Sequence, residues 1–228
     1  MTSPTRTSTT GARLAAVAAV AGVLLLTPSP ASASTYVAGY RMDETSGRTM
    51  HDVARRYDGT VGSDVRLTGG TYKFLAPPAA YRPQHLVTVP NATALNPGTG
   101  TWSMTARFRY TQSSGNIVQK GQAGGSYFKL ESRGGSLSCL FRGASGSKSV
   151  GTGTRHFNDG LWHTVTCKRS GSTVSLVIDG NVRSGTGVTG SITNTRPLSI
   201  GGKTACNGDS VGCDYWIGEM DYLRVEVG

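Results

Sequence analysis

The sequence predicts an all-β, two-sheet antiparallel sandwich, and three observations support this class. Apolar residues recur at every second position, glycine accounts for 32 of 228 residues, and turn signals separate many short apolar segments. Patterns with a helical period of three to four residues are nearly absent. Short strands joined by Gly-rich turns bury their apolar faces by packing two sheets against each other.

The alternation is clearest between Thr101 and Tyr110. Its apolar positions are Trp102, Met104, Ala106, Phe108 and Tyr110. Successive side chains of a strand point to opposite faces, so this segment has one buried and one solvated side. Further strands are expected at Tyr36–Met42, His85–Val89, Asn116–Lys120, Tyr127–Ser132, Leu137–Arg142, Leu161–Arg169, Thr173–Ile178, Pro197–Ile200 and Tyr215–Val227.

Two turns predict an antiparallel meander in the second half of the chain. Asp179-Gly180 stands between alternating apolar segments, and a type I′ hairpin turn needs positive φ at both central residues. Ser170-Gly171-Ser172 joins the two strands before it as a second hairpin.

The first 33 residues resemble an export signal. Two arginines precede the apolar run Leu14–Leu26, which is too short to span a bilayer, and Ala31-Ser32-Ala33 is a cleavage site of the A-x-A type. An uncleaved membrane anchor is the alternative. We therefore expect a signal peptide at 1–33, one domain at 34–228, a secreted, extracellular protein, and no membrane span after cleavage.

The chain is basic, with a formal net charge of +10, of which two charges lie in the predicted signal. Such a surface favours polyanions, including acidic glycans, cell-wall phosphates and nucleic acid. The alternative is a solvated charged surface that keeps the protein soluble, because the basic residues are scattered.

All four cysteines lie in the predicted mature chain, and export to an oxidising compartment favours disulfides. Cys206 and Cys213 flank a short loop and can pair locally. Cys139 and Cys167 lie in two predicted strands and are candidates to bridge neighbouring strands. Zinc is the rival, but the spacing of the cysteines does not fit a C-x-x-C site.

The order of motifs resembles the laminin-G-like (LamG) jelly-roll family of the concanavalin A-like lectin/glucanase superfamily. The motifs begin at Tyr40–Gly47 and continue through His51-Asp52, Asp58-Gly59-Thr60, Val87–Pro90, the Trp102 strand, Ile117–Gly121, Asp159–Val165, Val174–Gly180, Pro197–Gly202 and Ile217–Val225. They run over nearly the whole mature chain. The resemblance implies a jelly-roll sandwich, but one fold hosts many functions. Trp162, which follows a tight turn, is expected to fill the core between the sheets.

The sequence offers no catalytic group that meets the needs of glycan chemistry. Glu219 and Asp221 share a strand face at a spacing suited to paired carboxylates, but the third acid of laminarinase-type glucanases is replaced by Arg224. Tyr127-Phe128-Lys129 is similar to a motif of polysaccharide lyases, and a lyase needs a Tyr or His base. Nothing in the sequence places Tyr127, Lys129 and His163 together.

The superfamily resemblance also implies a structural calcium ion that joins the start of the domain to its last strand. The matching residues are Asp43, Glu44, Glu219 and Asp221, with carbonyl groups from the Gly47 turn. Carboxylates and carbonyls supply the oxygen ligands that calcium needs. The alternative is that Asp43 and Glu44 only favour the turn before Gly47.

The leading functional hypothesis is a secreted, non-catalytic module that binds carbohydrate, an acidic or cell-wall glycan. Strand alternation and loop position give as candidate ligand-binding residues Arg107, Arg109, Tyr127, Lys129, Tyr215 and Trp216. The alternatives are a protein-binding adhesion domain on a cell surface and a glycoside hydrolase or lyase of the same fold. Nucleic acid is not an expected partner, because no nucleic-acid motif is present.

Overall fold

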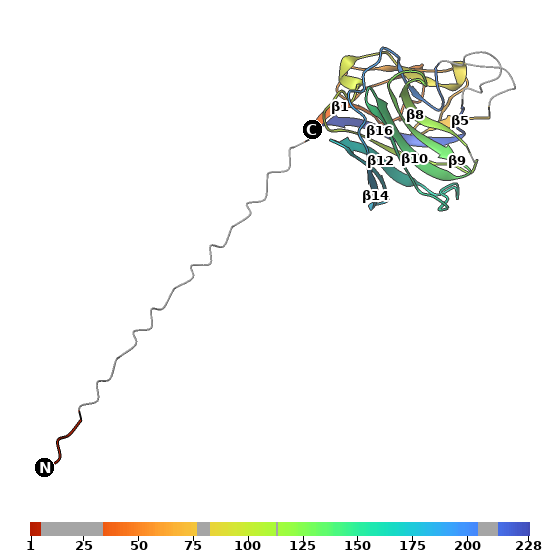
Figure 1. Ribbon diagram of the computed structural model, residues 1–228. Coiled ribbons are helices and arrows are strands. Elements are labelled where there is room, and N and C mark those ends of the chain that lie inside the picture. Colours follow the sequence, from red (N-terminus) through yellow and green to blue (C-terminus); the bar gives the residue numbers. More distant parts are fainter. Residues whose placement is uncertain (6–33, 77–82, 113, 205–213) are drawn as a thin grey trace. The chain divides into compact units, whose positions relative to one another are not determined.

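The computed structural model describes residues 1–5, 34–76, 83–112, 114–204 and 214–228, and its strands form two layers (Figure 1). We name the layers sheet A and sheet B; each has eight strands with antiparallel pairing. The predicted all-β jelly-roll sandwich is therefore confirmed for the unit Ala33–Gly228. The predicted signal peptide falls almost wholly outside the described residues and stays a prediction.

Sheet A consists of β1 (Thr35–Tyr40), β4 (Arg66–Leu67), β5 (Tyr72–Phe74), β7 (Trp102–Arg109), β12 (His163–Ser170), β13 (Thr173–Ile178), β14 (Asn181–Thr186) and β16 (Gly218–Val227). Sheet B consists of β2 (Thr49–Met50), β3 (Gly59–Val61), β6 (Val87–Val89), β8 (Gly115–Gly121), β9 (Tyr127–Arg133), β10 (Ser136–Gly143), β11 (Gly146–Gly151) and β15 (Leu198–Ile200). Two short 3-10 turns, η1 (Pro83–His85) and η2 (Thr93–Leu95), flank β6.

Both predicted hairpins form within sheet A. β12, β13 and β14 follow one another as an antiparallel meander, and Asp179 and Gly180 have φ values of 49° and 82° at the second turn. The other side of β12 pairs with β7, which in turn pairs with β16. β16 also pairs with β1, so the first and last strands of the unit lie side by side.

The core lies between the sheets and is built by the predicted alternation. Trp102 of β7 is fully buried, and its ring centroid lies 4.2 Å from that of Phe128 and 5.8 Å from that of Phe141 on the opposite sheet. Tilted and edge-to-face aromatic pairs at this separation add to the gain from burial alone. Aromatic rings from β7 of sheet A and from β9 and β10 of sheet B therefore pack together in a single core between the sheets.

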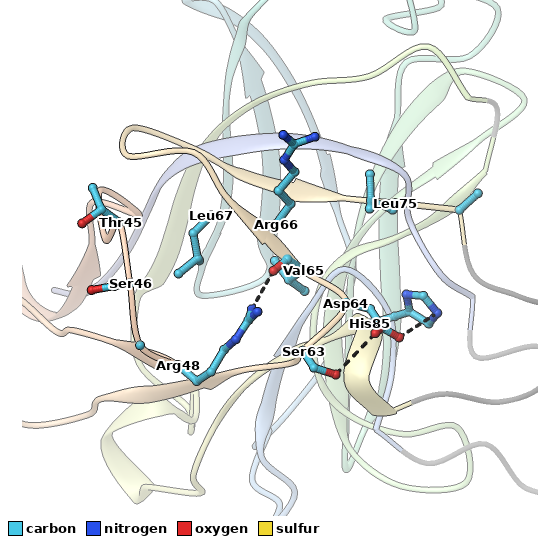
Figure 2. Close-up of a pocket in the computed structure, with 12 residues that line it drawn as sticks. Thr45, Ser46, Arg48, Ser63, Asp64, Val65, Arg66, Leu67, Leu75 and His85 are labelled. Carbon is cyan, nitrogen blue, oxygen red and sulfur yellow. Dashed lines mark hydrogen bonds and ion pairs between the residues drawn. The ribbon is translucent and has the colours of Figure 1, made fainter.

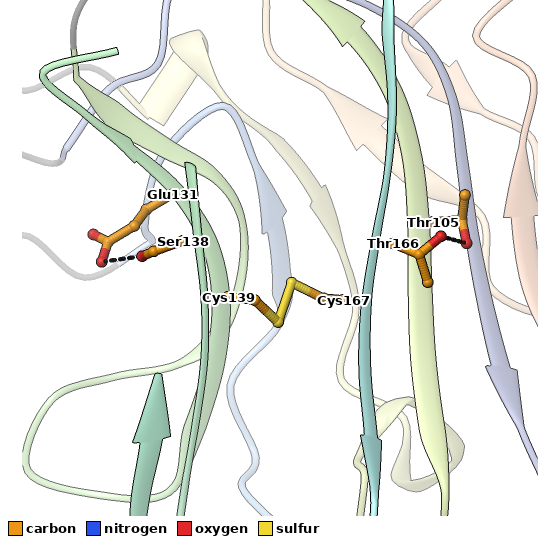
Figure 3. Close-up of a disulfide and its surroundings, with 6 residues drawn as sticks. All are labelled: Thr105, Glu131, Ser138, Cys139, Thr166 and Cys167. Carbon is orange, nitrogen blue, oxygen red and sulfur yellow. Dashed lines mark hydrogen bonds between the residues drawn. A yellow bond between two sulfur atoms is a disulfide. The ribbon is translucent and has the colours of Figure 1, made fainter. Parts of the chain in front are cut away.

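Cys139 and Cys167 form a disulfide with a Cα–Cα distance of 5.6 Å. We expected this pair to bridge neighbouring strands, but the two cysteines lie on opposite sheets, in β10 and β12, and the bond crosses the core (Figure 3). Both side chains occupy inward positions of alternating strands, so they face each other across the sandwich. The predicted pair Cys206 and Cys213 lies outside the described residues.

Two buried cations fasten the loops at one end of the sandwich. Lys120 is fully buried, and its ammonium lies 2.8–3.2 Å from oxygens of Asn91, Asn96 and Asn194. Arg169 is 1% exposed. Its guanidinium donates to the carbonyl oxygens of Pro97, Gly98, Gly100 and Gly190 and to the hydroxyl of Thr189. Neutral oxygens therefore replace the water that each cation loses on burial.

Among the residues that the structure describes, no helix has the length and apolarity needed to cross a bilayer.

Candidate ligand-binding groove

The six predicted ligand-binding residues do not converge on one site. Arg107 and Arg109 lie on the outer face of sheet A, whereas Tyr127 and Lys129 lie on β9 of sheet B. Tyr215 precedes β16 and is half-buried, with its ring 5.3 Å from that of His85. The prediction therefore mixed residues of opposite faces.

Trp216, a candidate ligand-binding residue, is buried and cannot offer its ring to a ligand at the surface. Its side chain is 1% exposed and packs against Phe74, Phe108 and Tyr110 at centroid distances of 5.5–6.1 Å. The residue lies in the approach to β16, where its ring is directed into the core.

Trp162 was expected in the core, and it lies instead on the outer face of sheet A. The residue after it, His163, pairs with Phe108 on the inner side, so alternation turns Trp162 outward. The guanidinium carbons of Arg107 and Arg109 lie 4.8 and 5.1 Å from its ring centroid. Cations at this distance from an indole are attracted by the electron-rich ring face.

Two carboxylates of β16 neutralise the same arginines. Asp221 pairs with Arg107, and Glu219 pairs with Arg109 at 2.8 Å and with Lys73 at 3.3 Å. Burial would raise the pKa of Glu219, but its hydrogen bonds to Arg109 and Lys73 lower it. Burial raises the pKa of Asp221 despite Arg107. Both acids thus form ion pairs that link β16 to β7.

Three of the residues proposed for calcium, Glu44, Glu219 and Asp221, have hydrogen-bond or ion-pair partners elsewhere in the fold. Glu44 accepts a hydrogen bond from the His51 amide at 2.8 Å and another from the Tyr72 hydroxyl. Asp43 and Gly47 are exposed. Within the described ranges, no three His, Cys, Asp or Glu side chains are arranged to hold a metal ion. Calcium binding stays a prediction.

A groove of about 430 Å³ opens between β8, β9 and the segment that leads to β16. Its lining residues are Ser114, Gly115, Asn116, Glu131, Ser132, Arg133, Asp214 and Tyr215. Such a volume falls within the range of small-ligand sites. The groove combines an amide, two carboxylates, a guanidinium and a phenol ring.

A β-bulge turns Asn116 toward this groove. Asn116 pairs with Glu131 and Val118 pairs with Leu130, so Ile117 is the extra residue in β8. The Asn116 amide is 2% exposed and donates to Gln119 Oε1 at 2.7 Å and to Asp214 Oδ2 at 3.3 Å. Bulges commonly redirect a side chain beside a binding site.

Three donors hold the carboxylate of Glu131. Lys129 Nζ lies 2.6 Å and Arg133 Nε 3.1 Å from its Oε2. Ser138 Oγ lies 3.2 Å from its Oε1, and Figure 3 shows this contact. The carboxylate is therefore fixed in orientation. The side chain of Lys129, a candidate ligand-binding residue, is only 12% exposed.

Gly115 lets the wall of the groove approach its floor. A Cβ atom at this position would lie 2.5 Å from the Tyr215 carbonyl oxygen and from Trp216 Cα, and the residue has φ of 153°. Only glycine fits such a close approach of two backbones. The backbone N–H of Asn116 donates to the backbone carbonyl oxygen of Asp214 at 2.7 Å, which fixes the start of this wall.

The groups considered for catalysis lie apart. Tyr127 and Lys129 belong to sheet B, whereas His163 belongs to sheet A and contacts Asp179 at 2.7 Å and Asp159 at 3.1 Å. Burial would lower the pKa of His163, but the two carboxylates raise it. The histidine therefore holds the turn of the β13–β14 hairpin.

Comparison with known proteins identifies the central part of this architecture. Residues 108–216 match the family model described as Laminin G domain. This part of the chain resembles a laminin G domain. Neurexin-4 of Drosophila melanogaster is 34% identical over 112 residues, which span 46% of this chain and 9% of that protein. The laminin G-like match supports a binding module.

Solved structures share the fold at low identity. The binding domain of botulinum neurotoxin serotype G aligns with a TM-score of 0.61 and 13% identity, covering 85% of this chain and 47% of that chain. The binding domain of Paraclostridial Mosquitocidal Protein 1 gives 0.60 and 12%, with the same coverage. This chain thus spans about half the length of each of these structures, and the likeness concerns the fold.

Proposed function

We propose that the chain is an extracellular, non-catalytic module that binds carbohydrate through the groove between β8, β9 and residues 214–215. The observation that carries the proposal is the set of oriented polar groups in that groove. Asn116 and Glu131 are almost fully buried, and the hydrogen bonds described above hold their side chains in place. Tyr215 offers an aromatic side chain at the wall.

Sugar hydroxyls are both donors and acceptors, and planar side chains bind them in pairs. Carboxylates accept, guanidinium groups donate, and an amide does both. Groups that are already fixed lose little rotamer freedom on binding, which favours affinity. The basic chain adds a preference for an acidic or cell-wall glycan.

Retention on immobilised polysaccharides tests this function. The mature chain is passed over a broad set of neutral and acidic glycans at low salt, and we expect retention on at least one acidic or cell-wall polysaccharide. Arg133→Ala removes an exposed donor of the groove and is expected to weaken that retention about tenfold, the loss of one charged hydrogen bond.

Arg142→Ala is the matched control, because Arg142 is exposed on β10 of the same sheet and does not line the groove. We expect it to retain wild-type binding. Equal losses in the two variants would contradict the groove, and no retention on any glycan would contradict the function.

Protein recognition is the second candidate, and the edge of sheet A favours it. β14 ends the strand order of that sheet, and Val182 within it is 65% exposed. An exposed edge strand offers backbone groups to an extended segment of a partner. Binding to a cell-surface protein that survives Arg133→Ala and is lost on Val182→Lys would favour this candidate.

A further inference from the structure

One pocket of the described residues lies outside the segment that matches the laminin G family model. It has a volume of about 970 Å³, and its described lining lies within residues 45–85, whereas the match covers 108–216. Figure 2 shows Arg48, Arg66, Asp64 and His85 around this pocket. The family match therefore does not cover this pocket, which is lined by β4 and the loops around it.

The buried imidazole ring of His85 lacks hydrogen-bond partners. Its side chain is 6% exposed, and neither ring nitrogen has a hydrogen-bond partner. Nε2 lies 3.4 Å from Asp64 Oδ2, which is an ion-pair distance without hydrogen-bond geometry. Buried polar atoms without partners are uncommon and costly, so an unpaired imidazole that lines a pocket points to a ligand.

The two arginines give the pocket a positive character. Arg48 Nη1 donates to the carbonyl oxygens of Gly62 at 3.0 Å and Val65 at 2.7 Å, which fixes the guanidinium (Figure 2). A guanidinium has five N–H donors, so others remain for a ligand. The backbone of Arg66 pairs with Lys73 in the sheet, and its side chain has no hydrogen-bond or ion-pair partner among the described residues.

One acid opposes these cations. Asp64 accepts a hydrogen bond from Ser63 Oγ at 3.3 Å and faces His85. Two permanent positive charges and a buried ring donor thus outweigh a single carboxylate. Guanidinium groups form short, charge-assisted hydrogen bonds with oxygen anions.

We propose that this pocket binds an oxyanion, namely the carboxylate, sulfate or phosphate group of a ligand, with Arg48, Arg66 and His85 as donors. The pocket adjoins the proposed glycan groove, because the His85 ring packs edge-on against that of Tyr215 at 5.3 Å, but its other lining residues differ and the proposal does not rest on glycan binding. The oxyanion comes either from an acidic sugar or from a free inorganic anion.

Amide chemical-shift titration of the mature chain at low salt tests the proposal and separates the two sources. The probes are sodium glucuronate, glucose, sodium sulfate and sodium phosphate. We expect at least one of the three anions to shift signals of residues 45–85, while glucose leaves them unchanged. A response to glucuronate assigns a sugar carboxylate, and a response to sulfate or phosphate alone assigns an inorganic anion.

Two variants probe the donors. Arg66→Gln and His85→Gln are each expected to weaken anion binding about tenfold or more. Arg183→Gln, on the exposed strand β14, removes the same charge elsewhere and is expected to leave binding unchanged. Arg66 is exposed, so its variant keeps the test valid if His85→Gln fails to fold.

The proposal is overturned if no anion shifts these signals, or if Arg66→Gln and Arg183→Gln weaken binding equally, which indicates general charge attraction. Arg133→Ala distinguishes the two sites, because it is expected to impair glycan retention through the groove and to leave the anion response intact.

Discussion

At the scale of single residues, the two buried cations at one end of the sandwich carry the clearest energetic consequences. Each sits among uncharged oxygens, and neither has a carboxylate partner within the described part of the chain. Lys120 organises three asparagines, and Arg169 ties two loops to β12. Their removal leaves several buried acceptors without donors.

Arg169→Met is expected to lower the free energy of unfolding by about 3 kcal/mol or more, since each buried acceptor left unpaired costs about 1–3 kcal/mol. Urea denaturation measures this change. Arg183→Met, on the exposed β14, is the control and should stay within about 0.5 kcal/mol of the wild type. A similarly small effect for Arg169→Met would contradict the proposal that Arg169 stabilises the fold by tying the two loops to β12.

Burial lowers the pKa of Lys120 to about 8, from an ordinary value of 10.5. The unfolded chain then binds the proton more tightly than the folded chain between these two values, so the contribution of Lys120 to stability increases as pH rises from about 8 to 10.5. Below pH 8 this contribution is constant.

Urea denaturation of the wild type and of Lys120→Met at pH 7, 8, 9 and 10 tests this linkage. The difference in unfolding free energy should move in favour of the wild type by at most about 1.4 kcal/mol for each pH unit above 8. A difference that does not change with pH would show that the ammonium keeps its ordinary pKa.

At the scale of elements, the β13–β14 hairpin depends on its turn. Gly180 has φ of 82°, and a Cβ atom there would meet no other atom within 4 Å. Gly180→Ala is therefore expected to destabilise the protein through backbone strain alone, by about 1 kcal/mol. Gly180→Asn is the control, because asparagine tolerates positive φ. Thermal unfolding of both variants checks this order, and equal melting temperatures would contradict it.

The sequence predicted long alternating strands well and short or irregular ones poorly. β13 begins and ends at the predicted residues, Thr173 and Ile178. Strands β2 to β5 have only two or three residues each, too few for a period to be visible. β11 is rich in glycine and serine and has a single buried apolar residue, Val150.

The groove was missed because its residues depend on irregularities. Strict alternation would place Asn116 on the same face as Val118, and the bulge at Ile117 separates them. Trp162 and Trp216 were assigned to the wrong environments because each lies just before a strand. Alternation assigns a residue to the inner or outer face only when the residue at which the strand begins is known.

At the scale of the whole molecule, the disulfide joins the two sheets across the core. Cys139 and Cys167 are 28 residues apart, and closing a loop of this length is expected to stabilise the fold by about 3.5 kcal/mol. The variant with both cysteines changed to alanine should lose about this amount in urea denaturation without reductant. A loss below about 1 kcal/mol would contradict a large role for the bond.

At the end of the sandwich that Lys120 and Arg169 hold together, the cations are side chains of the protein itself rather than bound metal ions. Such cations cannot be lost by dilution, exchanged for other ions or removed by a chelating agent. The loops from residues 91 to 100 and 189 to 194 should therefore keep one shape in brine, in fresh water and in a medium scavenged of divalent ions.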